Sequence, residues 1–177
     1  ELVIGSVALK VITKAPCPAM AMSSYATHEG YTKIVIPIET GANSRQKVNY
    51  AIEFAKKFSA SLHAVALLGA DEESEKGNME LILHQIQELA QEKGVTYHSE
   101  VLSNLKNRAT ATVEYINTIG ADLVMIMTDQ DAELSGFFLG PYSQQIIHLS
   151  KVPVIALKPK ELYSSGELSM IPGTSGS

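Results

Sequence analysis

The sequence has one cysteine, no tryptophan and an aromatic content of only 6%. A single cysteine, Cys17, excludes an intramolecular disulfide framework and a cysteine-rich metal site, and it favours a reducing, cytoplasmic location. No apolar run approaches the roughly 18 residues that a membrane-spanning helix needs, so we expect no membrane segment. Basic residues are also few: 14 stand against 19 acidic ones, and the net charge of -5 argues against nucleic-acid binding.

The chain nevertheless has ample material for a folded core, since 45% of its 177 residues are hydrophobic. This length suits one domain with an appendage. Short apolar runs, typical of strands buried on both faces, alternate with segments of helical periodicity. The expected strands are 34–38, 62–68, 95–101, 123–127 and 152–157, and the expected helices are 48–58, 79–89, 109–119 and 141–149. This alternation predicts an α/β fold with a parallel sheet covered by helices on both faces.

Local signals mark where these elements begin and end. Asn43 and Gln46 have the spacing of a capping box ahead of the first long helix. The segment from 128 to 139 is expected to be a loop, because it lacks apolar periodicity. Glycine and proline supply the remaining signals: helix caps at Gly94, Gly120 and Gly140-Pro141, and the start of an edge strand at Pro153.

An internal repeat indicates how the chain is organised. Residues 5–18 can be laid on residues 140–153 at an offset of 135, and both segments read as glycine, amphipathic helix, proline and short apolar strand. Residues 1–22 are therefore interpreted as the last helix and strand of a preceding copy. The full division is a remnant at 1–22, a linker at 23–31, a domain at 32–160 and a disordered tail at 161–177.

The remnant is expected to be ordered. Its helix has an apolar stripe at Val7, Val11 and Ala15, and residues 19–22 supply a short strand. Because an unpaired strand edge invites association, we expect this strand to pair with the edge formed by Val152 to Leu157, in the same chain or a neighbouring one. The alternative is a disordered end.

Two segments of the domain resemble the universal stress protein family. The opening strand ends in an acidic residue, as Ile36-Pro37-Ile38-Glu39, and a turn rich in small polar residues follows, as Thr40-Gly41-Ala42-Asn43-Ser44. The closing unit Gly140-Pro141-Tyr142-Ser143-Gln144-Gln145-Ile146-Ile147 leads into Lys151-Val152-Pro153-Val154. The remnant resembles the same family ending. The resemblance implies an open five-stranded sheet in the order 3-2-1-4-5, dimerisation through the last strand and, in some members, adenine nucleotide binding.

The positions that match the family's nucleotide site depart from its pattern. Nucleotide-binding members have three spaced glycines, whose backbone amides approach the phosphates closely. Here those positions are Met127, Gln130 and Gly140, and Pro141 lacks an amide at the start of the helix. Glu39 stands where the family has an aspartate. We therefore predict a cleft at the carboxyl ends of the first and fourth strands, without a cofactor and without tight ATP binding.

Other polar residues give weaker signals. Asp129, Asp131 and Glu133 place three carboxylates near the expected phosphate position, either as a solvated acidic loop or as a divalent-cation site. The five histidines are scattered, although His63 and His98 lie on strands that are expected neighbours, and no metal site is predicted. Cys17 has no neighbouring base, and no catalytic constellation is present.

These observations predict a non-catalytic stress-response module that acts through dimerisation and an unknown protein partner. The main alternative is a universal stress protein that binds ATP or another adenine nucleotide despite a degenerate phosphate loop. An enzyme of the wider group of adenine-nucleotide α/β proteins is a third interpretation.

Overall fold

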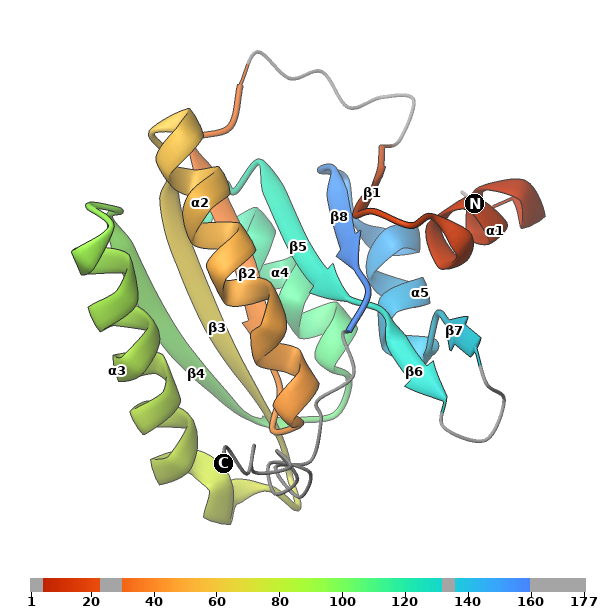
Figure 1. Cartoon of the computed structure of the whole chain (residues 1–177). Helices are drawn as coiled ribbons and strands as arrows, with labels where there is room; N and C mark the ends of the chain where they lie inside the picture. The colour runs from red at the N-terminus through yellow and green to blue at the C-terminus, as the bar shows by residue number, and fades with distance from the viewer. Residues whose placement is uncertain (1–4, 23–29, 132–135, 160–177) are drawn as a thin grey trace, which may run out of the picture.

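A six-stranded sheet forms the centre of the molecule (Figure 1). The computed structural model describes residues 5–22, 30–131 and 136–159. Its strands are β1 (Ala19–Ala21), β2 (Lys33–Ile38), β3 (Ser61–Gly69), β4 (Tyr97–Leu105), β5 (Leu123–Met127) and β8 (Val154–Leu157), arranged in the order β1-β8-β5-β2-β3-β4. The pairs β2–β3, β2–β5, β3–β4 and β5–β8 are parallel, which confirms the predicted order of the five domain strands.

The sixth strand is β1, which pairs antiparallel with β8 at the edge of the sheet. This pairing confirms that the N-terminal segment is ordered and that its strand covers the edge of the last strand within the same chain. Its helix, α1 (Ser6–Lys14), lies beside α5 (Pro141–Leu149), and both are seen at the right of Figure 1.

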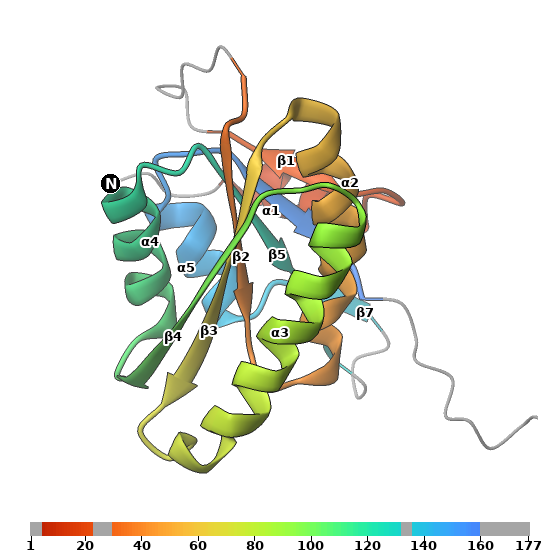
Figure 2. The ribbon, with the colours of Figure 1, turned by 90° about the vertical axis from the view of Figure 1, so that its left-hand side faces the viewer.

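Helices cover both faces of the sheet (Figure 2). α2 (Val48–Phe58) and α3 (Lys76–Glu92) pack on one face, and α4 (Arg108–Ile119) and α5 pack on the other. Short 3₁₀ helices precede α2 (η1, Ala42–Lys47) and α3 (η2, Glu73–Glu75). Strand β2 shows why the sheet is buried on both sides: Ile34 and Ile36 contact the α2–α3 layer, whereas Val35 contacts the α4–α5 layer, and all three are fully buried.

The predicted helix ends are confirmed where glycine supplies them. Gly94 and Gly120 have φ values of +73° and +62°, a left-handed conformation that costs glycine little. Gly120 follows α4 directly, and Gly94 lies two residues after the end of α3. Gly140 precedes α5 as its N-cap, with Pro141 at the first helical position.

Two local predictions were wrong. Asn43 and Gln46 do not cap α2, because the chain first forms η1, and there the Gln46 Nε2 donates a 2.9 Å hydrogen bond to Asn43 Oδ1. The expected loop between residues 128 and 139 contains a two-stranded antiparallel hairpin, β6 (Asp129–Asp131) and β7 (Gly136–Phe138). The two strands of this hairpin do not alternate apolar and polar residues, so the sequence pattern could not predict them.

Two strand boundaries also differ from expectation. β4 begins at Tyr97 and continues to Leu105, because its backbone keeps pairing with β3 beyond the apolar run. β8 begins at Val154, since Pro153 has no amide to donate, and its carbonyl instead accepts from the Val124 amide at 3.1 Å. With β1 beside it, β8 is an interior strand and not the edge strand that was predicted for Pro153.

The remaining expectations concern segments of which little is described. The predicted tail at 161–177 and most of the predicted linker at 23–31 lie outside the described residues. In the described part of the chain, no helix combines the length and apolar character that a membrane span requires.

Candidate functional site

The candidate site lies at the carboxyl ends of β2 and β5, which are neighbours in the centre of the sheet. After β2 the chain turns into η1 and α2 on one face, whereas after β5 it leads through the hairpin to α5 on the other face. Such a divergence leaves a crevice in open α/β sheets. A small cavity of about 230 Å³ is present here, lined by Glu39, Asn107, Arg108, Ala109, Tyr142 and Gln145.

Arg108, the first residue of α4, connects two carboxylates across this crevice. Its guanidinium forms an ion pair with Glu72 through Nη2, and its Nη1 lies 3.6 Å from Glu39 Oε1. The three side chains are only one fifth to one third exposed, so solvent screens these charges less than at an open surface. The guanidinium is therefore neutralised by the chain's own acids.

Glu72 is held from several sides. The Gly69 amide donates to its Oε2 at 2.8 Å, and the Thr40 hydroxyl donates to its Oε1 at 3.2 Å. The Gly69 amide makes the largest contribution to lowering the pKa of Glu72, and Arg108 lowers it further. This carboxylate stays ionised and fixes the position of Arg108.

A buried lysine lies behind Glu39. Lys47, at the end of η1, is 2% exposed and donates from Nζ to the carbonyl of Ser44 and, at 3.1 Å, to the Ser44 hydroxyl. The same hydroxyl accepts a 2.9 Å hydrogen bond from the Glu39 amide. Burial lowers the pKa of Lys47 to about 7, and the negative charge of Glu39 opposes this shift. Ser44 thus links the end of β2 to the lysine.

The opposite wall is formed by a hydrogen-bonded chain between α4 and α5. The Thr112 hydroxyl donates to the Arg108 carbonyl at 2.8 Å, so the Tyr142 hydroxyl, 3.1 Å away, donates to Thr112. Burial raises the pKa of Tyr142, and the Glu39 charge raises it further. Tyr142 is therefore a neutral hydrogen-bonding group at neutral pH.

Thr128 follows β5 directly and has an unusual hydroxyl. The residue is 2% exposed, and its Oγ1 is a buried side-chain oxygen with no hydrogen-bond partner within the described segments. A buried hydroxyl without a partner is costly, and such groups are uncommon in native structures. It marks a polar position inside the carboxyl edge of the sheet.

The residues predicted for the site reach this edge, but their side chains do not all line the crevice. Glu39 lines the cavity beside Arg108, and Gly140 is the buried N-cap of α5. The Met127 carbonyl accepts a 3.0 Å hydrogen bond from Ser143 of α5. Gln130 lies in β6, and its side chain is outside the described part. Asp129 and Asp131 form the same strand, and Glu133 is not described.

Met127 instead lines a larger cavity, of about 920 Å³, on the α2 side of the sheet. Leu157 lies beside it, and the cavity is closed by Pro16 to Pro18, the outer side of α2 and residues after β8. Cys17 is an exposed free thiol at this cavity. The methionine that replaces a family glycine thus points to the face opposite α5.

Sequence reasoning missed Lys47, Glu72, Arg108 and Tyr142 as members of one cluster. A signal for Lys47 was present. Ser44 lies one helical turn before Val48, and Lys47 lies one helical turn before Ala51, so both positions continue the apolar stripe of α2 toward the N-terminus. Arg108 and Tyr142 begin two helices that follow different strands, and only the topology brings them together.

The histidines expected to be neighbours are paired across β3 and β4. His63 and His98 are in register, and their rings stack with centroids 4.7 Å apart. The Ser61 hydroxyl donates a hydrogen bond to the Thr32 carbonyl, so its oxygen accepts a hydrogen bond from His63 Nε2, 3.0 Å away. Burial, His98 and Lys33 lower the pKa of His63 to about 4. No group of three potential metal ligands occurs among the residues that can be described.

Comparison with known proteins identifies the family of this fold. Residues 30–158 match the universal stress protein family. A relative, universal stress protein MJ0531 of Methanocaldococcus jannaschii, is 29% identical over 146 residues, which cover 74% of this chain and 85% of that protein.

Solved structures agree with this assignment at the level of the fold. A universal stress protein from Archaeoglobus fulgidus DSM 4304 superposes with a TM-score of 0.72 at 18% identity, over 89% of this chain and 56% of that chain. A universal stress protein solved in complex with cAMP superposes with a TM-score of 0.58 at 18% identity, over 73% of this chain and 98% of that chain. Both matches support an α/β fold of this type.

Proposed function

The chain belongs to the universal stress protein family, and we propose that it is a non-catalytic regulatory module that acts through protein contacts without binding ATP tightly. The single cysteine supports placing it in the reducing cytoplasm. The observation that carries the proposal is the pairing of Arg108 with both Glu39 and Glu72 in the crevice at the centre of the sheet.

This pairing occupies the arginine that lines the cavity. An arginine binds phosphate best through a free planar fork, whereas the Arg108 guanidinium already faces two carboxylates. A triphosphate entering the crevice has to break these contacts and then lies beside Glu39 and Glu72. The cavity beside Arg108, about 230 Å³, is also smaller than the roughly 300–1,000 Å³ of most small-molecule sites, whereas the larger cavity that Met127 lines is formed without Arg108.

The backbone at the phosphate position adds to this argument. Met127 and Gln130 have side chains where the family has glycine, and Pro141 removes an amide from the start of α5. Asp129 and Asp131 add two carboxylates in β6, next to the same position in the sequence. Close approach of the backbone to a phosphate is therefore disfavoured by shape and by charge.

A thermal-shift titration with ATP and Mg²⁺ tests this proposal. A ligand present at 100 times its dissociation constant stabilises the native state by about 2.7 kcal/mol, which raises the melting temperature by several degrees. At ~1 mM ATP we expect a rise of no more than about 1–2 °C, because ATP at a concentration equal to its dissociation constant stabilises the native state by only about 0.4 kcal/mol. A saturating rise at ~10 μM ATP would contradict the proposal.

A smaller adenine ligand is the second candidate function. The Thr128 hydroxyl, which has no hydrogen-bond partner among the described residues, favours it, because a ligand oxygen or nitrogen is one group that satisfies a buried donor. A structural neighbour was solved with cAMP. If such a ligand contacts Thr128, then Thr128→Val abolishes its binding. If none does, the same variant removes a costly buried hydroxyl and stabilises the protein by about 1 kcal/mol.

We further propose that residues 1–22 are the closing helix and strand of a preceding repeat and that residues 32–160 form the domain. The antiparallel contact of β1 with β8 then corresponds to the contact of two domains through their last strands, as a pseudo-dimer within one chain. The match over 89% of this chain but 56% of a longer Archaeoglobus protein supports this organisation.

A further inference from the structure

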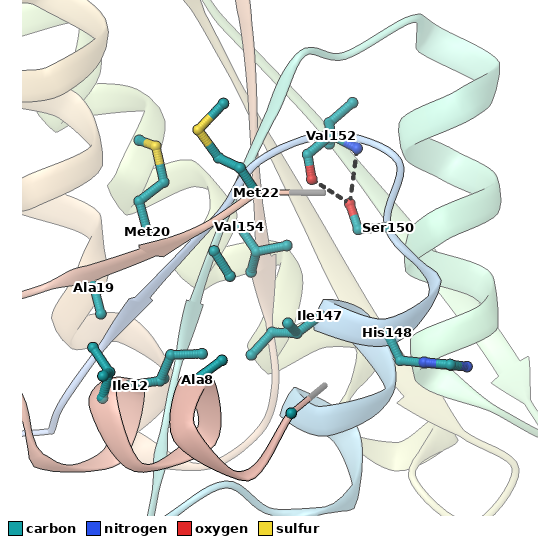
Figure 3. A pocket seen from close by; sticks show the side chains of 13 residues that line it. Ala8, Ile12, Ala19, Met20, Met22, Ile147, His148, Ser150, Val152 and Val154 are labelled. Carbon is teal, nitrogen blue, oxygen red and sulfur yellow. Dashed lines mark hydrogen bonds between the residues drawn. The ribbon is translucent and has the colours of Figure 1, made fainter. Parts of the chain in front are cut away.

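An apolar cavity of about 440 Å³ lies between the N-terminal helix and strand on one side and α5 and β8 on the other (Figure 3). Its walls come from four elements: Ala8 and Ile12 of α1, Ala19 of β1, Ile147 of α5 and Val154 of β8. A space of this size is uncommon in a packed protein, where side chains leave few gaps larger than a water molecule. Its volume lies within the roughly 300–1,000 Å³ that is typical of small-molecule sites.

Small side chains on the N-terminal side create this space. Ala8 on α1 and Ala19 and Ala21 on β1 line the cavity with single methyl groups, whereas the opposite wall has larger side chains such as Ile147. Among the described side chains of α1, Ile12 alone is buried, and it is 5% exposed. The atoms that line the cavity therefore lack dispersion contacts on one side, and an occupant of matching shape would supply them.

The lining of the cavity suits an uncharged molecule. None of the described residues that line it is an acid, a lysine or an arginine. The Ser150 hydroxyl is already engaged, since it donates to the Val152 carbonyl at 2.8 Å and accepts from the Val152 amide at 3.2 Å. His148 is the other polar side chain of the lining, and Figure 3 shows it extending away from Ala8 on α1. A charged ligand would lose its hydration here without gaining an opposite charge.

The size and polarity of the cavity also favour a hydrocarbon body over water. A buried water needs about two to four polar partners, and the lining offers few. An engineered cavity of about 150 Å³, lined by aliphatic and aromatic side chains, stays dry and binds benzene. The cavity between α1 and α5 is about three times as large, which gives room for on the order of 10–15 non-hydrogen atoms.

We infer that this cavity is a binding site for a small, uncharged, largely hydrocarbon molecule, of the size of a two-ring aromatic alcohol. Such a ligand contacts α1 and β1 on one side and α5 and β8 on the other. It therefore binds only the state in which β1 is paired with β8, and by linkage it strengthens that pairing. The site shares no lining residue with the crevice at Arg108, so it does not depend on whether ATP binds there.

Binding of 1-naphthol, which is uncharged at pH 7, tests this inference. We expect saturable binding with a dissociation constant on the order of 100 μM, measured by the fluorescence anisotropy of the probe. 1-Naphthoate has the same ring system with a carboxylate, and we expect it to bind at least about tenfold more weakly. No saturable naphthol binding below ~1 mM, or equal binding of the two compounds, would overturn the inference.

Trypsin cleavage after Lys14, the last residue of α1, shows whether the probe binds between α1 and α5. Cleavage follows the population in which α1 has left the sheet, so naphthol at ten times its dissociation constant should slow it about tenfold. Naphthoate should not slow it, and neither compound should inhibit trypsin on a free peptide. Unchanged cleavage with saturating naphthol would overturn the inference. Protection that rises with protein concentration in the absence of naphthol would assign the cavity to a second copy of the chain and would also overturn it.

Two substitutions that fill the cavity complete the test. Ala8→Leu and Ala19→Leu each place a larger apolar side chain in its wall. Each should weaken naphthol binding by about tenfold while cleavage after Lys14 without the probe stays as slow as in the native chain. Val7→Leu, at an exposed position of α1 outside the lining, is the matched control and should leave the affinity unchanged. Full naphthol affinity in both alanine variants, or faster cleavage in both, would overturn the inference, because neither result is compatible with a cavity at these positions.

Discussion

Lys47 places an ionisable group in the hydrophobic layer between the sheet and α2. The Lys47 Nζ donates to the carbonyl and to the hydroxyl of Ser44, and the negative charge of Glu39 favours its ionised form. Removing an ammonium group from water is costly, and these two acceptors offset only part of the cost. The lysine therefore links the stability of the candidate site to pH.

We predict that the free energy of unfolding rises as the pH increases from 7 to about 9.5. The folded-state pKa of Lys47, about 7, lies below its ordinary value of 10.5, so the unfolded chain binds more protons in this interval. Lys47→Met should flatten this dependence and stabilise the protein at pH 7 by about 1–3 kcal/mol, after the lost hydrogen bonds to Ser44 are discounted. Urea unfolding at several pH values measures both effects.

Lys57→Met, at an exposed position of α2, is the control for this experiment and should change neither quantity. If Lys47→Met retains the full pH dependence of the native chain, then Lys47 does not titrate as we describe.

His63 gives a second prediction, in the acid range. Its folded-state pKa is about 4, compared with 6.5 in a free side chain, so the unfolded state binds more protons below pH 6.5. Stability should therefore fall as the pH decreases from 6.5 to 4, by about 2 kcal/mol at pH 5. His63→Gln should lose this component, whereas His84→Gln on exposed α3 should keep it. Equal acid sensitivity of both variants would contradict the assignment.

At the scale of elements, the β1–β8 contact joins the N-terminal helix and strand to the rest of the sheet. Strand β1 covers the edge of β8, and α1 contributes Ile12 to the core around α5. Edge strands with unpaired amides and carbonyls tend to pair with another chain. Strand β1 therefore occupies the edge of β8 at which another strand would otherwise pair.

Deletion of residues 1–30 should expose β8 and allow two chains to pair through it. We expect the fraction of chains that form dimers to increase with protein concentration, and light scattering after size-exclusion chromatography measures this fraction. We also expect lower stability, since loss of the buried Ile12 alone costs about 2 kcal/mol. A matched deletion of residues 161–177 should change neither property. An unaltered oligomeric state and melting temperature after the N-terminal deletion would contradict this role.

At the scale of the whole molecule, the sequence predicts the layers of the fold better than the contents of the site. Apolar runs such as 34–38 and 123–127 predict buried strands because each residue meets a hydrophobic layer on one face or the other. The helix caps Gly94 and Gly120 are equally legible, because few other residues adopt their conformation.

The cluster of Glu39, Glu72 and Arg108 could not be predicted in this way. These residues follow β2, follow β3 and begin α4, and they meet only because parallel strands end at one edge of the sheet. The β6–β7 hairpin was missed for a related reason, since backbone pairing alone defines it. Contacts set by topology leave no periodic signal in the sequence.

Isothermal titration calorimetry of the chain with ATP and Mg²⁺ at pH 7 tests the central claim most directly. If Arg108 is committed to Glu39 and Glu72, ATP gains no free cation in the crevice, and the dissociation constant should be about 1 mM or weaker, a binding free energy no better than about -4 kcal/mol. Saturable binding with a micromolar dissociation constant, near -8 kcal/mol, would contradict the account and identify the protein as a nucleotide-binding member of its family.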